Sequence, residues 1–364
     1  MRANPRLVML VAIALSVCVG ARAQATNEQA LSAAQPNARG AADAAPAVGA
    51  IKWQLKTGGS VYSMPVLAGD GTLYFGSYDY NVYAVDAGGG QERWRVRTGG
   101  RIIGAPCVAA GMVYVGSQDN RLYALDAGSG QVRWKFKAVY ALTTTPVVAG
   151  DTVYVSGSDG MLYALDAATG KQRWTFGVKR GTPTAPVVAG DMIYVGSAAG
   201  LQAVGREKGE QRWAFTAAGA VVGAPVLFDG TLYFGTLRGN LYAVEATTGK
   251  ERWHTQVEGG LPFSPAVAEG RVYFGGIGGT LYAADAHDGR ELWRYTSEQG
   301  VTSAPTVADA LVHFGTARGL VALDTETGRL RWTFPTNSIV TSAPVIRAGL
   351  IYFGGWDGTL YAVN

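Results

Sequence analysis

A short alternation of apolar and polar positions repeats along most of the chain. In the third repeat the turns read Ala-Gly-Asp, Ser-Asp-Gly and Thr-Gly. The apolar and β-branched segments beside these turns span residues 145–148, 153–155, 162–165 and 173–176. Short segments of this kind, bounded by glycine-containing turns, predict strands joined as an antiparallel meander. Each repeat is therefore expected to form four β-strands.

A tryptophan marks every repeat at a period near 40 residues. Successive spacings are 41, 40, 40, 39, 40, 40 and 39 residues, and only Trp356 lies outside the series. Four strands per unit at this period predict the blades of a β-propeller. We assign the eight tryptophans a structural role, in which each indole fills the gap between neighbouring blades. They are Trp53, Trp94, Trp134, Trp174, Trp213, Trp253, Trp293 and Trp332.

The two ends of the repeat region complement each other. The segment 51–54 carries a tryptophan but has no preceding strands of its own, whereas the last unit ends at 360–364 before any tryptophan-bearing strand. The N-terminal strand is therefore expected to complete the C-terminal blade, which removes an open sheet edge. The predicted fold is all-β, an eight-bladed β-propeller of four-stranded antiparallel blades over residues 51–364.

The first 50 residues lie outside the repeats. Residues 1–23 are typical of a secretory signal peptide, with a basic start, an apolar stretch too short to span a membrane, and Ala-Arg-Ala before Gln24. Residues 24–50 are Ala-rich and without periodicity, as expected of a disordered tether. An alternative makes Cys18 a lipid-modified cysteine. Both interpretations predict an exported protein, periplasmic or secreted.

Charge and composition narrow the class of partner. The chain has 31 Lys plus Arg and 27 Asp plus Glu, and Arg2, Arg6 and Arg22 fall in the signal segment, which leaves 28 basic against 27 acidic residues. A nearly neutral body argues against nucleic-acid binding, which needs clustered positive charge. With 48% hydrophobic residues the chain is too apolar to be disordered. We expect a monomeric propeller with a protein partner, no nucleic acid and no membrane span.

The motif Ala-x-Asp-x-x-x-Gly-x-x-x-Trp closes most of the repeats, the first time at Trp94. Its glycine supplies the positive φ of a tight turn, and its aspartate can accept bonds from turn amides. Gly205 and Glu245 replace the aspartate in the fourth and fifth units. The motif resembles the tryptophan-docking repeat of the pyrroloquinoline quinone (PQQ) dehydrogenase-like propellers across roughly residues 51–364. The resemblance implies their fold, and it leaves function open because sites are grafted onto folds.

Members of that family with enzyme activity carry parts that this sequence lacks. The resemblance implies a quinone stacked on a pair of adjacent cysteines and a calcium ion held by oxygen ligands. Here the two cysteines, Cys18 and Cys107, are far apart, and His254, His287 and His313 occupy different repeat positions. We therefore expect no catalytic residue, metal or cofactor. The alternative is a PQQ- and Ca²⁺-dependent periplasmic oxidoreductase.

One aspartate recurs at the turn between the second and third strands of four units. Grouped carboxylates suggest acid–base chemistry, but aspartate also favours turns by bonding its own backbone. We assign turn formation to all four, which are Asp79, Asp119, Asp159 and Asp357.

The loops that enter each repeat vary most, and with these turns they are expected to share one face of the ring, where a rigid scaffold presents binding loops. Tyr62, Tyr78, Tyr80 and Trp356 should converge where the first and eighth units meet. Aromatic side chains with polar tips are favoured in protein contacts. Two interpretations stay open, contact with a partner and capping of the ring closure.

A second candidate patch is basic and consists of Lys179, Arg180 and Arg238. The segments 179–186 and 203–209 resemble the irregular blade of the BamB family, propeller scaffolds of outer-membrane β-barrel assembly. That resemblance implies that Arg180 contacts the central barrel subunit. The alternative is a solvated rim. Together these features predict an exported, non-catalytic scaffold that binds a protein or small-ligand partner in the cell envelope, with outer-membrane protein assembly as one role.

Overall fold

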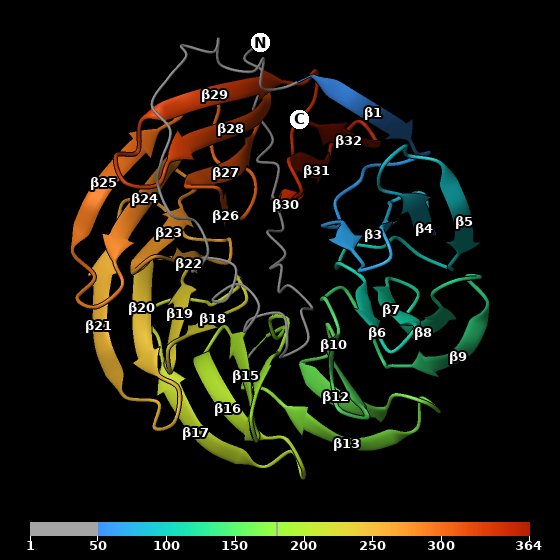
Figure 1. The fold of residues 1–364 in the computed structure, drawn as a ribbon. Helices are drawn as coiled ribbons and strands as arrows, with labels where there is room; N and C mark the ends of the chain where they lie inside the picture. Colours follow the sequence, from blue (N-terminus) through green and yellow to red (C-terminus); the bar gives the residue numbers. More distant parts are fainter. Residues whose placement is uncertain (1–49, 180) are drawn as a thin grey trace, which may run out of the picture.

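The ring of eight blades predicted from the repeats is the fold of the protein. The computed structural model describes residues 50–179 and 181–364, and all regular elements within them are β-strands (Figure 1). They form eight sheets of four antiparallel strands. The predicted signal peptide 1–23, Cys18 and all of the tether 24–50 except Ala50 lie outside the described residues, as does Arg180.

Each blade runs from a short strand near the centre of the ring to a long strand at its outer edge (Figure 1). The innermost strands are β2 (Val66–Leu67), β6 (Cys107–Ala109), β10 (Val147–Ala149), β14 (Val187–Ala189), β18 (Val226–Phe228), β22 (Ala266–Ala268), β26 (Thr306–Ala308) and β30 (Val345–Arg347). The second strands are β3 (Thr72–Gly76), β7 (Met112–Ser117), β11 (Thr152–Ser156), β15 (Met192–Ser197), β19 (Thr231–Gly235), β23 (Arg271–Gly275), β27 (Leu311–Thr316) and β31 (Leu350–Gly354).

The outer half of each blade holds the longer strands. The third strands are β4 (Asn81–Asp86), β8 (Arg121–Asp126), β12 (Met161–Asp166), β16 (Gly200–Gly205), β20 (Asn240–Glu245), β24 (Thr280–Asp285), β28 (Gly319–Asp324) and β32 (Thr359–Val363). The outermost strands are β5 (Glu92–Arg97), β9 (Val132–Lys137), β13 (Gln172–Gly177), β17 (Gln211–Thr216), β21 (Glu251–Gln256), β25 (Glu291–Thr296), β29 (Leu330–Pro335) and β1 (Ile51–Lys56).

The ring closes as the sequence predicts. Seven blades use four consecutive strands, whereas the eighth has the order β1-β32-β31-β30. Strand β1 pairs antiparallel with β32, in a register that matches Lys56 with Thr359. Inner strands begin later than predicted; β10 starts at Val147 rather than 145, because Pro146 has no N–H to give to a strand ladder.

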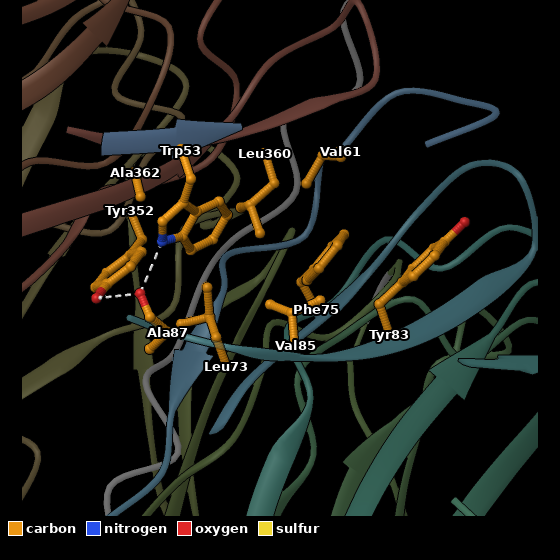
Figure 2. Packing of buried hydrophobic residues seen from close by; sticks show 10 residues of the cluster. All are labelled: Trp53, Val61, Leu73, Phe75, Tyr83, Val85, Ala87, Tyr352, Leu360 and Ala362. Carbon is orange, nitrogen blue, oxygen red and sulfur yellow. Dashed lines mark hydrogen bonds between the residues drawn. The ribbon is translucent and has the colours of Figure 1, made fainter. Parts of the chain in front are cut away.

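Tryptophans join each blade to the next. At the seam between blades 8 and 1, the Trp53 indole donates its N–H to the Ala87 carbonyl over 2.8 Å, and the Tyr352 hydroxyl donates to the same oxygen over 3.1 Å (Figure 2). Gly90 lies beneath the indole with φ +75, and a Cβ there would lie 2.6 Å from the Trp53 ring. Glycine is therefore needed at this position both for its backbone conformation and for the close approach of the ring.

The core lies in the second and third strands and at the seams. Strand β3 is buried at every position, and Leu73, Phe75 and Val85 belong to the same buried cluster as Trp53 in the first seam (Figure 2). Near the centre of the ring, small side chains and one methionine form a further cluster of Met64, Ala105, Ala304 and Ala343. Because the second and third strands are packed in this way, the loops that connect the strands are held on a rigid set of blades.

Candidate interaction face

One face of the ring carries most of its exposed apolar side chains. Strands alternate in direction, so the turns between second and third strands share a face with the loops that lead from each outer strand to the next blade. We call this the loop face. Of the ten large hydrophobic side chains exposed among the described residues, seven lie on it: Tyr80, Val139, Tyr140, Leu237, Ile277, Ile339 and Trp356. These side chains come from turns and loops around the ring, and the loop face is therefore the candidate interaction surface.

Three of the four predicted aromatic residues make one cluster where blades 8 and 1 meet. Tyr62 stacks on Tyr78 with ring centroids 5.8 Å apart, and it meets Trp356 edge-on at 6.5 Å. Tyr80 instead lies beneath the guanidinium of Arg97, 5.7 Å from its ring centre. Of the four residues, Trp356 in the cluster and Tyr80 outside it are the two that are exposed.

The buried part of this cluster is a support. Tyr62 is buried, and that burial raises the pKa of its hydroxyl to about 12, helped by the neighbouring Tyr78. Burial also raises the pKa of Tyr78, although Arg101 lies 5.1 Å over its ring and opposes the shift. Ser60 Oγ donates to the Trp356 carbonyl over 2.7 Å, which ties the loop to the turn. Trp356 is thus held in place while 49% of its surface stays exposed.

The predicted basic patch belongs to two separate blades. Lys179, in the loop after β13, donates its backbone N–H to Gln202 Oε1, and its carbonyl accepts from Ser197 Oγ. Arg238 lies in the turn after β19, where its side chain covers Gly219. Both lie on the loop face, and Arg180 falls outside the described residues.

The four turn aspartates hold their own turns. Asp79 accepts from the amide of Asn81 over 2.9 Å and from the hydroxyl of Tyr83 over 2.6 Å. Its burial favours the neutral acid, but these bonds and one from the Gly58 amide outweigh burial and lower the pKa of Asp79. The same two hydrogen bonds, from an amide two residues on and from a tyrosine hydroxyl, occur at Asp119, Asp159 and Asp357. Their tyrosine partners make these carboxylates structural elements of the loop face.

The described residues do not fit a quinone and calcium site. Nowhere in 50–179 and 181–364 do three or more His, Cys, Asp or Glu side chains come together as metal ligands. Cys107 is buried in β6, and His254 and His287 lie on other parts of the fold from His313. A calcium site built on several carboxylates is therefore not assembled by this part of the chain.

Sequence reasoning missed several exposed apolar side chains of the loop face. Val139 and Tyr140 are 69% and 59% exposed, and Leu237 and Ile277 occupy the turn position that holds Gln118 in blade 2 and Ser158 in blade 3. The available signal was a bulky apolar residue at a turn position of the repeat.

Within the described residues no helix is long and apolar enough to cross a membrane.

Comparison with known proteins identifies relatives of the whole ring. The family model described as outer membrane protein assembly factor BamB matches residues 40–174, 122–261, 198–319 and 258–364. The crystal structure of BamB from Moraxella catarrhalis is similar with a TM-score of 0.77 and 19% identity, covering 87% of this chain and 100% of that one.

Two further matches are too distant or too short to assign a function to this chain. The quinohemoprotein alcohol dehydrogenase ADHIIG of Pseudomonas putida HK5 has a TM-score of 0.72 at 18% identity, over 86% of this chain and 76% of that one. Such low identity shows a common fold alone. The uncharacterized protein YxaL of Bacillus subtilis (strain 168) is 52% identical over 42 residues, which is 12% of this chain and 10% of that protein. The match thus spans a small part of the curated relative's length.

Proposed function

We propose, because the chain belongs to the family described as outer membrane protein assembly factor BamB, that it is an exported, non-catalytic scaffold whose loop face binds a protein partner in the cell envelope. A monomeric ring is sufficient for this role. The nearly neutral body and the rigid blades suit a protein that positions another protein.

One observation carries the proposal. Seven of the ten exposed large hydrophobic side chains lie on the loop face, whereas the other three, Ile51, Phe228 and Leu330, lie at strand ends toward the opposite face. Water-exposed aromatic and aliphatic groups are costly unless a partner covers them, and Trp and Tyr are enriched among residues that dominate binding energy. Trp356 and Tyr80 are the residues that we assign to the centre of the contact.

The partner that family membership favours is the central subunit of the barrel-assembly machinery. Lys179 and Arg180 would then extend the contact toward blade 4, and Arg238 toward blade 5. The aromatic cluster and these basic residues lie on different blades, so the proposed contact is broad.

The test is a binding measurement with the purified chain and the periplasmic part of that barrel subunit from the same organism. Replacing Tyr80 and Trp356 together by serine should weaken binding at least tenfold. The matched control is Phe228→Ser, an exposed apolar residue of similar size on the opposite face, which should leave affinity unchanged. Equal affinity of all three proteins would refute the proposed contact.

The alternative function is oxidoreduction with PQQ and Ca²⁺. It is considered because the chain shares its fold with the quinohemoprotein alcohol dehydrogenase. Calorimetric titration of PQQ with Ca²⁺, followed by a dye-linked alcohol or aldose oxidation assay, separates the two functions. Saturable binding with turnover would replace the scaffold by an enzyme.

A further inference from the structure

The loop face of the third blade contains a hollow of about 290 Å³. Its walls include the turn residues Asp159 and Gly160, the first residue of β12, Met161, and the last residue of β13, Gly177. The hollow has a carboxylate at its edge and a methionine along one wall. Comparison with the sister blades explains how it arises.

The residues at one position of the strand register determine whether side chains fill the volume of the hollow. The first residue of each third strand pairs with the last residue of the outer strand. Four blades carry the turn aspartate, namely blades 8, 1, 2 and 3, and in them these pairs are Thr359 with Lys56, Asn81 with Arg97, Arg121 with Lys137, and Met161 with Gly177. Blades 8, 1 and 2 each place at least one cation here, and blade 3 places none.

In blades 8 and 2 a cation lies beside the turn aspartate. Lys56 Nζ lies 3.9 Å from Asp357 Oδ2, and an Arg121 guanidinium nitrogen lies 3.5 Å from Asp119 Oδ2. In blade 1, Arg97 covers the ring of Tyr80. Asp159 has the same turn position, but no ion pair reaches it from residues 50–179 or 181–364.

Asp159 also has fewer hydrogen bonds than its counterparts. It accepts from the Met161 amide over 3.0 Å and from the Tyr163 hydroxyl over 2.5 Å. Two of the equivalent carboxylates accept a further backbone bond, Asp79 from Gly58 and Asp119 from Gly99, each over 2.9 Å, and Asp357 accepts a further bond from the Thr359 hydroxyl. A carboxylate offers about four lone-pair sites, so Asp159 retains capacity for a charged donor.

We propose that the hollow receives an arginine or lysine side chain of the protein partner, at the position that Lys56 and Arg121 fill within their own blades. The inserted cation completes the charge-assisted contact that Asp159 lacks, and Met161 packs along its aliphatic stem. The inference rests on the proposed function in one respect, since the cation is supplied by a bound protein.

The first test needs no partner. The full chain carries six methionines, so ¹³C-methyl labelling gives few signals, and the Met161 methyl reports directly on the hollow. Titration with acetylarginine amide should move that signal saturably, whereas acetylnorleucine amide should not. Asp159→Asn should abolish the response. A response equal for both amides, equal in Asp159→Asn, or absent from the wild type would overturn the proposal.

A second variant fills the hollow from within. Gly177 has room for a side chain, since an added Cβ would meet only the Met161 sulfur at 3.6 Å, and sister blades carry Arg97 and Lys137 at its position. Gly177→Arg should fold normally, lose the methyl response to acetylarginine amide, and bind the barrel subunit at least fivefold more weakly. The matched control is Gly177→Ala, which should keep the methyl response and the affinity for the barrel subunit. A methyl response without any protein binding would refute the scaffold function alone. Unaltered protein binding by Gly177→Arg would refute the proposal that a partner's cation enters the hollow.

Discussion

His313 packs its imidazole against the indole of Trp332, with ring centroids 5.4 Å apart, and its Nδ1 has no hydrogen-bond partner among the described residues. Other blades carry a tyrosine at this position, as at Tyr273, which donates to the Thr325 carbonyl of the next blade. Within residues 50–179 and 181–364, the seam between blades 7 and 8 therefore has no counterpart of the hydrogen bond that Tyr352 donates at the following seam.

This difference predicts acid sensitivity. Burial lowers the pKa of His313 from 6.5 to about 4, with a bond involving Thr306 and the charge of Asp309 opposing the shift. The unfolded chain binds this proton near pH 6.5 and the folded chain resists it, so stability is full above pH 6.5 and falls as the pH drops toward 4. The loss should be about 3 kcal/mol.

The measurement is urea unfolding at several pH values for the wild type and His313→Phe. Phenylalanine keeps a ring against Trp332 and removes the unpaired nitrogen, so the variant should lose this part of the pH slope. Identical slopes for both proteins between pH 6.5 and 4 would show that His313 titrates normally in the folded state.

The blade tryptophans should dominate stability. Trp253 is buried, and its indole N–H donates to the Ala286 carbonyl over 3.1 Å. Trp253→Ala should lower the free energy of unfolding by about 3–5 kcal/mol. Trp253→Phe should cost less, because Tyr233 still donates to the same carbonyl over 3.0 Å. Equal costs for both variants in urea unfolding would contradict a packing role.

Two reasons for glycine at position 90 can be measured separately: the close approach of the Trp53 ring and the positive φ of the backbone. Gly90 and Gly71 have φ of +75 and +79, but only Gly90 lies against a tryptophan; an added Cβ at Gly71 has nothing within 4 Å. Both Gly→Ala changes pay the conformational cost. Gly90→Ala should be more destabilising by a further 1–3 kcal/mol or so from overpacking against Trp53. Thermal or urea unfolding of the two variants measures the difference.

The loop-face aromatics should matter little for folding. Trp356 is half exposed, so Trp356→Ser should change the free energy of unfolding by no more than about 0.5 kcal/mol, as for other surface substitutions. Tyr62 is buried beneath it, and Tyr62→Ala should destabilise the protein clearly. A large loss of stability in Trp356→Ser would make that residue a cap of the ring closure.

Much of the fold follows from the repeat itself. The spacing of the tryptophans and the missing strands beside Trp53 predict both the blade number and the closure, because local turns and strand patterns repeat in register. The exposure of individual loop side chains, by contrast, does not follow from the repeat. Tyr62 and Trp356 look alike as loop aromatics, yet one is buried beneath the other, which depends on how two blades meet. The hollow beside Gly177 arises from side chains that are missing, and only the strand register shows which they are.

Site-specific photocrosslinking tests the scaffold function most directly. A photoreactive phenylalanine analogue is placed in living cells at Tyr140 or Trp356 on the loop face, or at Phe228 on the opposite face. The account predicts crosslinks to the central barrel-assembly subunit from Tyr140 and Trp356 and none from Phe228. Crosslinks to that subunit from Phe228 alone, or none from any position, would contradict a loop-face scaffold.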